Sequence, residues 1–216
     1  MTERLPKTAS VATAADGAKL HAPAAARNVG FLCDLLREHA PLSGDALEIA
    51  SGTGQHIVAF AEALPGLTWQ PTEVDAARRA SIDAYTADAK LPNLRAARTL
   101  NATDLGWHAA QTPLDLVLLV NLLHLISDAA AEVLLREAMA ALRPSGRFIL
   151  YGPFKRAGVL TSAGDTRFDA DLRGADPAIG YKDDRDVTRQ LETAGASSVQ
   201  QIDMPANNLA FIATKT

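Results

Sequence analysis

The chain has 216 residues, of which 48% are hydrophobic and 21% charged, enough for one domain with a full core. Its formal net charge of −4 supplies no basic surface for a polyphosphate backbone, so a nucleic acid is not the expected partner. Cys33 is the only cysteine, which excludes an intramolecular disulfide and a cysteine-based metal cluster, and it is expected in the core. The sequence shows neither the apolar core of a signal peptide nor a run of transmembrane length, so a soluble, cytoplasmic protein without a membrane partner is expected.

Residues 1–20 are rich in alanine, threonine and serine and show no apolar periodicity, which predicts a flexible tail or a segment that orders over a ligand. We expect a single domain over residues 21–216. Its first helix should begin at Pro23, because proline fits the first turn of a helix and the following apolar residues recur at helical spacing. This helix is expected to pack as a cap on the rest of the domain.

From residue 46 onward, short apolar runs alternate with segments of helical periodicity. This alternation predicts a Rossmann-like, doubly wound α/β fold, in which helices cover both faces of a mostly parallel sheet. The run LDLVLLV suits a central strand, and the last two strands have so short a link that they should form an antiparallel hairpin. Seven strands are expected, over 46–50, 67–73, 94–100, 114–120, 147–152, 198–204 and 208–215. Helices are expected over 54–64, 75–89, 127–142 and 184–194, the third of them capped by Ser127.

The segment 153–182 is polar, contains several glycines and is poorly periodic, and a connection of this length usually has a function. We expect a lid-like insert. Its basic residues are Lys155, Arg156, Arg167 and Arg173, and its acidic residues include Asp165, Asp169 and Asp171. Mixed charge of this kind is typical of a solvated, salt-bridged surface, although one arginine could receive a substrate carboxylate.

The stretch EIASGTG lies where the first strand of the alternation turns into a helix. In open α/β sheets this turn usually contacts the ligand, at the carboxyl ends of the strands. Gly52 and Gly54 can adopt positive φ and let a ligand lie against bare backbone. Two cofactors are compatible with such a loop: a dinucleotide with its pyrophosphate at the helix end, or S-adenosylmethionine with its amino-acid part against the loop.

Two residues favour S-adenosylmethionine. A dinucleotide fingerprint needs a small residue three positions after the second glycine, where this chain has Ile57. Glu48 precedes the glycines, where a carboxylate does not help to bind a diphosphate but can hold an ammonium group or the amides of the loop. Farther along, Glu73 can accept two hydrogen bonds from a ribose diol, with Asp75 as a nearly equal alternative.

The order of these motifs resembles that of class I S-adenosylmethionine-dependent methyltransferases. The stretches HAPAAARN, LEIASGTGQH, LTWQPTEVD, NLLHLI, LYGPFKR, FDADLRGADPAIG and MPANNL together resemble the bacterial and animal family of domain of unknown function 938, which includes methyltransferase-like protein 26. This resemblance extends from about residue 21 to the end of the chain. It implies a class I methyltransferase fold and S-adenosylmethionine as cofactor, but no particular substrate.

The resemblance also implies a set of cofactor-binding residues. They are Arg27, Asn28, Glu48, Ser51, Gly52, Gly54, Glu73, Asn101, Ala102 and Asn121. The residues around the glycines would meet the methionine part, the acidic strand end the ribose, and Asn121 the sulfonium. At position 101 such enzymes commonly have aspartate, which accepts the adenine amino group. Asn101 can accept through its carbonyl, and Asp104 or Trp107 could contribute as well.

Methyl transfer from a sulfonium chiefly requires an aligned nucleophile and exclusion of water. A general base helps when the nucleophile carries a proton of high pKa. His124 is the first candidate for that base, the alternative being a buried histidine of the apolar stretch LLHLI. Tyr151 is the second catalytic candidate. His56 is expected to support the helix or the cofactor rather than to perform chemistry.

Four residues are candidates for the substrate pocket. Tyr151 and Phe154 follow an apolar strand and could wall the pocket, with strand-end packing as the alternative. Asn207 and Asn208 belong to a loop that could reach the pocket, with turn formation as the alternative.

The methyl acceptor is expected to be a small molecule bearing oxygen, nitrogen or sulfur. Methyltransferases that act on the amino groups of nucleic acids resemble one another in an Asn/Asp-Pro-Pro-aromatic turn, where this chain has NLLH. No acidic cluster has the spacing of a divalent metal site, so no metal is expected. A non-catalytic S-adenosylmethionine-binding protein would need the same loop and acids, and a nicotinamide-dependent oxidoreductase is a third hypothesis. The sequence indicates no oligomeric state.

Overall fold

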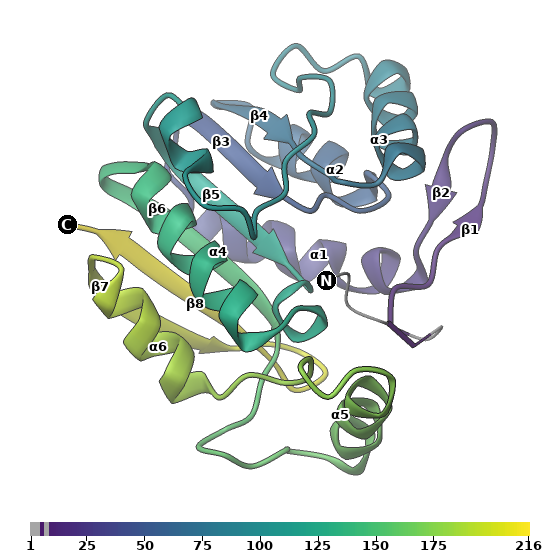
Figure 1. The fold of residues 1–216 in the computed structure, drawn as a ribbon. Helices are drawn as coiled ribbons and strands as arrows, with labels where there is room; N and C mark the ends of the chain where they lie inside the picture. The colour runs from purple at the N-terminus through teal and green to yellow at the C-terminus, as the bar shows by residue number, and fades with distance from the viewer. Residues whose placement is uncertain (1–4, 7–8) are drawn as a thin grey trace.

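The computed structural model describes residues 5–6 and 9–216, and its centre is a six-stranded sheet (Figure 1). The strand order is β4-β3-β5-β6-β8-β7. Strands β4, β3, β5 and β6 pair in parallel, whereas β8 pairs antiparallel with β6 and with β7. The strands are β3 Gly44–Ile49, β4 Leu67–Pro71, β5 Leu114–Val120, β6 Leu142–Pro153, β7 Ala196–Asp203 and β8 Asn208–Lys215. The prediction of a mostly parallel sheet that ends in an antiparallel hairpin is therefore confirmed.

The strand expected over 94–100 is absent, so the prediction of seven strands was wrong. Only two isolated parallel bridges join this segment to β4 and the residue that follows it, Trp69 with Leu94 and Thr72 with Arg98. Pro71 has no N–H to donate to a neighbouring strand, which interrupts the ladder between the two bridges. The side chain of Gln70 instead donates a hydrogen bond to the carbonyl of Ala96, at 2.8 Å. The seventh position at this edge of the sheet is thus a loop held at two points.

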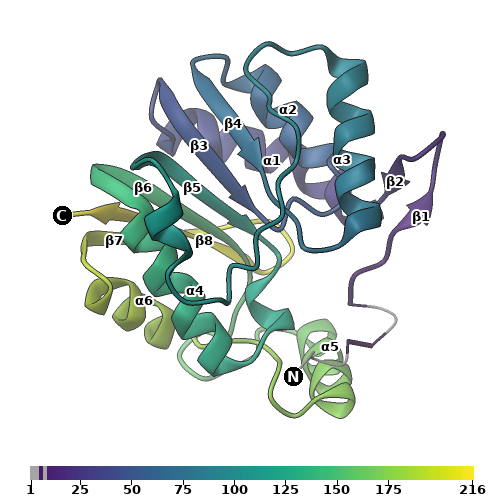
Figure 2. The same ribbon diagram turned by 45° about the horizontal axis from the view of Figure 1, so that its top comes forward.

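Helices cover both faces of the sheet (Figures 1 and 2). On one face lie α1 Pro23–His39, α2 Gln55–Ala63 and α3 Ala76–Ala89. On the other lie α4 Asp128–Ala141, α6 Asp184–Thr193 and the 3-10 helix η1 Trp107–Ala110. Ser127 caps α4 as expected, since its hydroxyl accepts a hydrogen bond from the amide of Ala130. Among the described residues, no helix is both long and apolar enough to cross a membrane.

The side chains of β5 alternate between two cores. Leu116 and Leu118 are fully buried against α1 and α2, whereas Val117 and Leu119 are fully buried against α4 and α6. Alternation of this kind follows from the two-residue period of a strand, and burial on both faces explains why LDLVLLV is apolar throughout. The strand therefore occupies the centre of the domain, as its sequence predicts.

The segment 153–182 contains a helix that its sequence did not reveal. Helix α5, Ala163–Ala175, is capped by Ser162 and buries only Asp169 and Leu172. A helix with one buried apolar side chain has no hydrophobic stripe, so helical periodicity is not visible. Leu172 packs with Tyr181 and with Leu125 of the short 3-10 helix η2, Leu123–Leu125. The insert thus adds a small third core to the end of the domain that carries the carboxyl ends of the strands.

The N-terminal part of the chain follows the edge of α3. Two short strands, β1 Thr13–Ala14 and β2 Leu20–His21, pair antiparallel. We name residues 9–22 the N-terminal strap. The flexible tail expected over residues 1–20 falls in part on residues 1–4 and 7–8, which lie outside the described residues. The strap contacts α3 through Leu20, whose amide donates a hydrogen bond to the hydroxyl of Ser81 at 2.8 Å.

Candidate functional site

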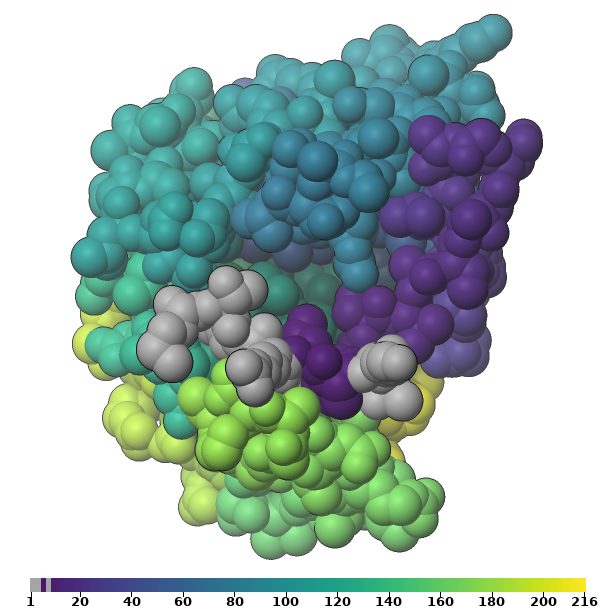
Figure 3. Space-filling view, turned by 45° about the vertical axis from the view of Figure 1, so that its right-hand side comes forward, coloured from purple at the N-terminus to yellow at the C-terminus, as the bar shows by residue number. Residues whose placement is uncertain are grey.

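A cavity of about 1160 Å³ lies at the carboxyl ends of β3, β4 and β5. The chain leaves β3 toward β4 on one side and later returns to β5 on the other, and this reversal of strand order is where ligands bind in open α/β sheets. The main lining segments are residues 9–12, 22–25, 48–53, 73–75, 100–104, 120–122 and 125–127. In Figure 3 the surface is hollowed between the purple N-terminal segment, the teal atoms of the middle of the chain and the green atoms below them.

The cavity brings together most of the residues that the sequence predicted for the cofactor. Those that line it are Arg27, Glu48, Ser51, Gly52, Glu73, Asn101, Ala102 and Asn121. Asp75 and Asp104, the two alternatives, line it as well. Asn28 and Gly54 do not belong to the lining, so their roles are indirect.

The glycine loop has the backbone that its sequence predicts. Gly52 has φ +61° and Gly54 has φ +92°, both in the region that favours glycine. A Cβ on Gly52 would meet no atom closer than 3.8 Å, so this position faces open space in the cavity. A Cβ on Gly54 would lie 2.8 Å from the Cα of Ile82. The second glycine is therefore required for close packing of the loop on α3, rather than for contact with a ligand.

Glu48 is buried at the bottom of the cavity, with 1% of its surface exposed. Its Oε2 atom has no hydrogen-bond partner among the described residues. Burial raises the pKa of this carboxyl to about 7; the nearby charge of Glu73 adds to the effect, and a hydrogen bond from Ser51 opposes it. A buried carboxylate without a partner is costly, and a cationic donor in the cavity would relieve that cost.

Glu73 holds the other side of the loop. Its carboxylate accepts hydrogen bonds from the amides of Val74 at 2.7 Å, Asp75 at 3.2 Å and Gly52 at 3.2 Å. The side chain is buried and lines the cavity. Two buried carboxylates thus face the cavity, and one of them, Glu73, bridges the ends of β3 and β4.

The segment after the interrupted edge forms a tight turn over residues 101–104. The side-chain oxygen of Asn101 accepts hydrogen bonds from the amide and the hydroxyl of Thr103, and its amide group donates to Asp104 at 2.8 Å. Trp107 supports the turn from outside the cavity by donating to the carbonyl of Ala102 at 3.1 Å. The side chain of Asn101 is therefore engaged within the turn, and the backbone and Asp104 remain to meet a ligand.

Asn28 connects the cap helix to the glycine-loop helix behind the cavity wall. Its side-chain oxygen lies 2.8 Å from Nε2 of His56, which lines the cavity, and its side chain also hydrogen-bonds with Tyr151. Burial lowers the pKa of His56 to about 4, so this imidazole is neutral at neutral pH. The chain of three residues fixes α1 on α2 and β6. It thereby sets the position of Arg27, an exposed lining residue with no partner among the described residues.

The structure does not bring His124 to the cavity. The side chain is 5% exposed, and its ring meets Phe168 and Tyr181 edge to face at 5.8 Å and 6.1 Å between centroids. Burial, together with the charge of Lys182, lowers its pKa to about 3. Its apolar surroundings are those of a core histidine, and the neighbouring Leu122, Leu125 and Ile126 line the cavity in its place.

The predicted substrate residues also lie away from the cavity. Tyr151 and Phe154 are buried, and the ring of Phe154 packs edge to face on Phe211. Asn207 and Asn208 form the β7–β8 turn, where Asn208 donates to the carbonyl of Pro205 and Asn207 to Asp165 of α5. Tyr151 and Phe154 thus belong to the two cores of the domain, and the two asparagines hold the β7–β8 turn.

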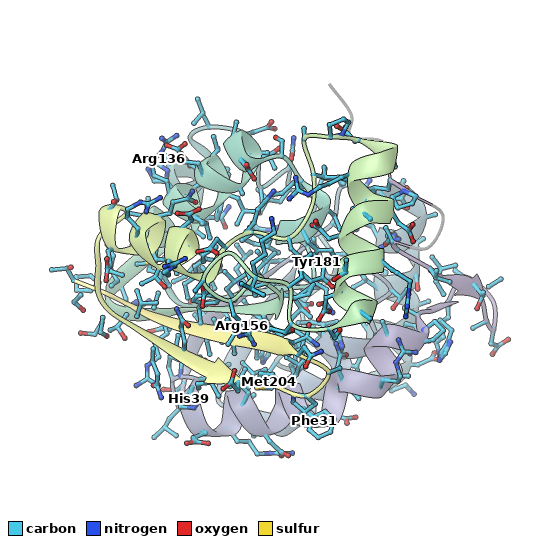
Figure 4. The ribbon with its side chains drawn as sticks, turned by 90° about the horizontal axis from the view of Figure 1, so that it is seen from below. Phe31, His39, Arg136, Arg156, Tyr181 and Met204 are labelled. Atoms are coloured by element: carbon cyan, nitrogen blue, oxygen red, sulfur yellow. The ribbon has the colours of Figure 1, made fainter. Side chains whose placement is uncertain are left out.

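Charged side chains of the insert form ion pairs both within it and with other parts of the fold. Arg173 pairs with Asp169 at 2.9 Å within α5, and Arg156 pairs with Asp203 at 3.3 Å. Figure 4 shows Arg156 over the β7–β8 hairpin and Tyr181 beside α5. Residues 153–182 contribute nothing to the described lining of the cavity, although Leu122 and Leu125, which do line it, pack on the core of the insert.

Sequence reasoning missed two parts of the site. Residues 9–12 of the strap line the cavity. Their composition was compatible both with a flexible tail and with a segment that orders over a ligand, so it did not predict this position. Arg78 lines the cavity from the first turn of α3, and its guanidinium donates to Ser10 at 2.7 Å. An arginine three residues after Asp75 on a predicted helix carried no distinguishing signal, because arginines usually occupy solvated helix faces.

Comparison with known proteins identifies the family of this chain and structures with a similar fold. The model of the family described as "Protein of unknown function (DUF938)" matches residues 19–215. An O-methyltransferase family protein from Burkholderia thailandensis has a TM-score of 0.78 with 16% identity, over 89% of this chain and 57% of that chain. A putative O-methyltransferase from Nostoc punctiforme has a TM-score of 0.76 with 21% identity, over 88% of this chain and 56% of that one.

A third structure was solved with a ligand. Human N-acetylserotonin methyltransferase in complex with S-adenosylmethionine has a TM-score of 0.73 with 12% identity, over 89% of this chain and 52% of that chain. These likenesses show that the fold is that of class I methyltransferases. This chain spans little more than half the length of the methyltransferases that it matches here.

Proposed function

We propose that this chain, which belongs to the DUF938 family, binds S-adenosylmethionine and transfers its methyl group to a small molecule. The observation that carries the proposal is the carboxylate of Glu48, which is buried in the cavity with one oxygen unpartnered. Its position near the carboxyl end of β3 is where the amino-acid part of the cofactor would meet the glycine loop. An ammonium group supplies both the hydrogen-bond donor and the positive charge that this oxygen lacks.

The remaining lining residues fit the rest of the cofactor. Glu73, at the end of β4, offers a carboxylate to a ribose diol. Arg27 is a cation without a partner in the described structure and would receive the cofactor carboxylate. The turn at 101–104 offers backbone groups and Asp104 to the adenine. The ammonium and the carboxylate of the ligand would thus each find a side chain of opposite charge in one cavity.

Bound S-adenosylmethionine supplies an activated methyl group on a sulfonium sulfur, which becomes a neutral thioether when a lone pair of the acceptor forms the new bond to carbon. The chain's own contribution is alignment and exclusion of water. Ala50 and Asn121 hold positive φ at the ends of β3 and β5, which is strained backbone of the kind found at ligand sites. Both residues line the cavity and would fix the direction of approach.

The lining offers little base catalysis. His56 is the only histidine in the described lining, and its lowered pKa of about 4 makes it a weak base. An acceptor that is nucleophilic at neutral pH without a strong base fits such a site best. We therefore propose an oxygen, nitrogen or sulfur nucleophile of the type found in phenols, amines and thiols.

The test has two steps. Calorimetry with S-adenosylhomocysteine measures binding, and methyl-labelled S-adenosylmethionine with a panel of small thiols, phenols and amines measures transfer. Binding with a labelled product supports the proposal. Binding without any product would favour a non-catalytic S-adenosylmethionine-binding protein, and binding of NAD(H) without S-adenosylhomocysteine would refute the cofactor assignment.

A further inference from the structure

We infer that the N-terminal strap and the glycine loop form one ligand-binding unit joined at Thr53, with Gln55 and Ser81 as positioning residues. This inference rests on the proposed function, because it concerns how the same cavity holds the cofactor. Thr53 lies between the two glycines of the loop, is buried and lines the cavity. Both its side chain and its carbonyl are held by residues that also hold the backbone of the strap.

Ser81 of α3 makes the first connection. Its hydroxyl donates a hydrogen bond to the carbonyl of Thr53 at 2.7 Å and accepts one from the amide of Leu20 at 2.8 Å. The side chain is fully buried, so neither bond competes with water. One hydroxyl therefore fixes the loop on one side and β2 of the strap on the other.

Gln55, the first residue of α2, makes the second connection. Its side-chain oxygen accepts a hydrogen bond from the amide of Ala22 at 2.6 Å and another from the hydroxyl of Thr53 at 3.0 Å. Ala22 is the last residue of the strap and lies immediately before α1. The end of the strap and the side chain of the loop thus share one acceptor.

The far end of the strap is held over the cavity by a third contact. The guanidinium of Arg78 donates to the hydroxyl of Ser10 at 2.7 Å and to its carbonyl at 3.3 Å. The same guanidinium is the nearest group to a Cβ built on Gly52, at 3.8 Å. Ala9 packs against the small core of the insert, to which Leu125 of the opposite wall belongs. Residues 9–12 therefore face the cavity beside the loop, and a ligand there contacts strap and loop together.

Two consequences follow from this connection. A ligand that orders the loop also stabilises the strap, because Thr53 transmits the constraint through two shared side chains, the buried Ser81 and the partly buried Gln55. Conversely, loss of either side chain loosens the loop and lets the strap leave the cavity. The expected result is weaker binding with faster dissociation, rather than loss of the fold.

The matched pair for the test is Gln55→Leu and Gln55→Glu. Leucine removes the shared acceptor, whereas glutamate keeps it and suits the N-terminus of α2. We expect Gln55→Leu to raise the dissociation constant for S-adenosylhomocysteine about fivefold, the factor that corresponds to one hydrogen bond, mainly through a faster off-rate. Gln55→Glu should bind like the wild type. Ser81→Ala is a second variant with the same expected direction, and Arg136→Gln, on the exposed face of α4 (Figure 4), is the neutral control.

Limited trypsin digestion supplies a readout that a purely structural role would not change. Lys19 lies in the strap, so cleavage after it reports opening of the strap. S-adenosylhomocysteine should slow this cleavage in the wild type and in Gln55→Glu, but much less in Gln55→Leu. Equal affinity and equal protection in the two variants would overturn the inference. Failure of the wild type to bind S-adenosylhomocysteine would instead overturn the proposed function, and cleavage rates without ligand would then decide whether Gln55 holds the strap.

Discussion

The buried carboxyl of Glu48 makes cofactor binding dependent on pH, and this dependence tests the proposed site. Burial raises its pKa to about 7, so about half of the ligand-free protein carries a protonated Glu48 at neutral pH. Only the ionised form attracts an ammonium group. The affinity for S-adenosylhomocysteine should therefore rise as the pH increases through 7, whereas an exposed carboxylate, which is ionised throughout this range, would leave the affinity constant.

The size of the effect follows from the ionised fraction. With a pKa of about 7, this fraction is about one tenth at pH 6 and about three quarters at pH 7.5, so the affinity should increase about eightfold over this interval. The interval ends below pH 8, because an α-amino group begins to lose its own proton there. Glu48→Gln is the control, since it removes the titration but leaves the size of the side chain and the titration of the ligand unchanged.

Calorimetric titrations at several pH values, with wild type and Glu48→Gln in parallel, measure the effect. The expected result is a rising affinity for the wild type and a lower, nearly flat affinity for the variant. A wild-type profile that is as flat as that of Glu48→Gln would refute the reasoning, because it would mean that this carboxyl does not meet the ligand's ammonium group. A falling profile would refute it as well.

Three further predictions concern stability. Glu48→Gln should raise the free energy of unfolding of the ligand-free protein by up to about 3 kcal/mol at pH 8, measured by chemical denaturation. The reason is that folding raises the pKa of this carboxyl from 4.5 to about 7, so its ionised form destabilises the folded state. The gain should shrink as the pH falls through 7 and vanish below 4.5. Between pH 7 and pH 4 the wild type should lose about 3 kcal/mol of its free energy of unfolding at His124, and His124→Phe should not show this loss. The reason is that the pKa of His124 is about 3 in the folded state and 6.5 in the unfolded state, so acid protonates it only when the chain unfolds. Turnover should be unchanged in this variant, and a loss of turnover without loss of stability would instead support the general-base hypothesis for His124. Gly54→Ala should lower the free energy of unfolding by more than Gly52→Ala, for which we expect about 1–2 kcal/mol from positive φ alone, since only the former forces a Cβ against Ile82.

The backbone of the site was predictable because it depends on patterns that are local in sequence. The apolar alternation fixed the sheet and the switch point, and the glycines fixed the loop that follows β3. Glu48 and Glu73 were predictable as lining residues because the carboxyl ends of adjacent parallel strands meet at one edge. The absence of a strand at 94–100 could also have been predicted, since Pro71 has no N–H to donate to a neighbouring strand.

The other features of the site could not be predicted from the sequence, because they depend on contacts between residues that are distant in the chain. His124 lies three residues after Asn121, yet the 3-10 turn of η2 directs its imidazole into the core of the insert. Helix α5 has a single buried apolar residue and no visible period. The strap is part of the cavity because Ser81, Gln55 and Arg78 hold its backbone. Every residue type offers the same backbone groups, so hydrogen bonds to them cannot be predicted from the composition of the strap.

The charge of the cavity favours S-adenosylmethionine over a dinucleotide, the two cofactors that the glycine loop allows. Glu48 and Glu73 already repel each other, since the charge of Glu73 raises the pKa of Glu48. A pyrophosphate laid against Gly52 would place two more negative charges beside these carboxylates, and both would have to be protonated or displaced. A ligand with an ammonium group, such as S-adenosylmethionine or S-adenosylhomocysteine, does the reverse, because it satisfies the free oxygen of Glu48 and lowers the cost of burying it. In direct competition for the wild type, S-adenosylhomocysteine should therefore bind more tightly than NADH. Glu48→Gln should narrow this difference in affinity, because it weakens the binding of S-adenosylhomocysteine and removes the repulsion between Glu48 and NADH.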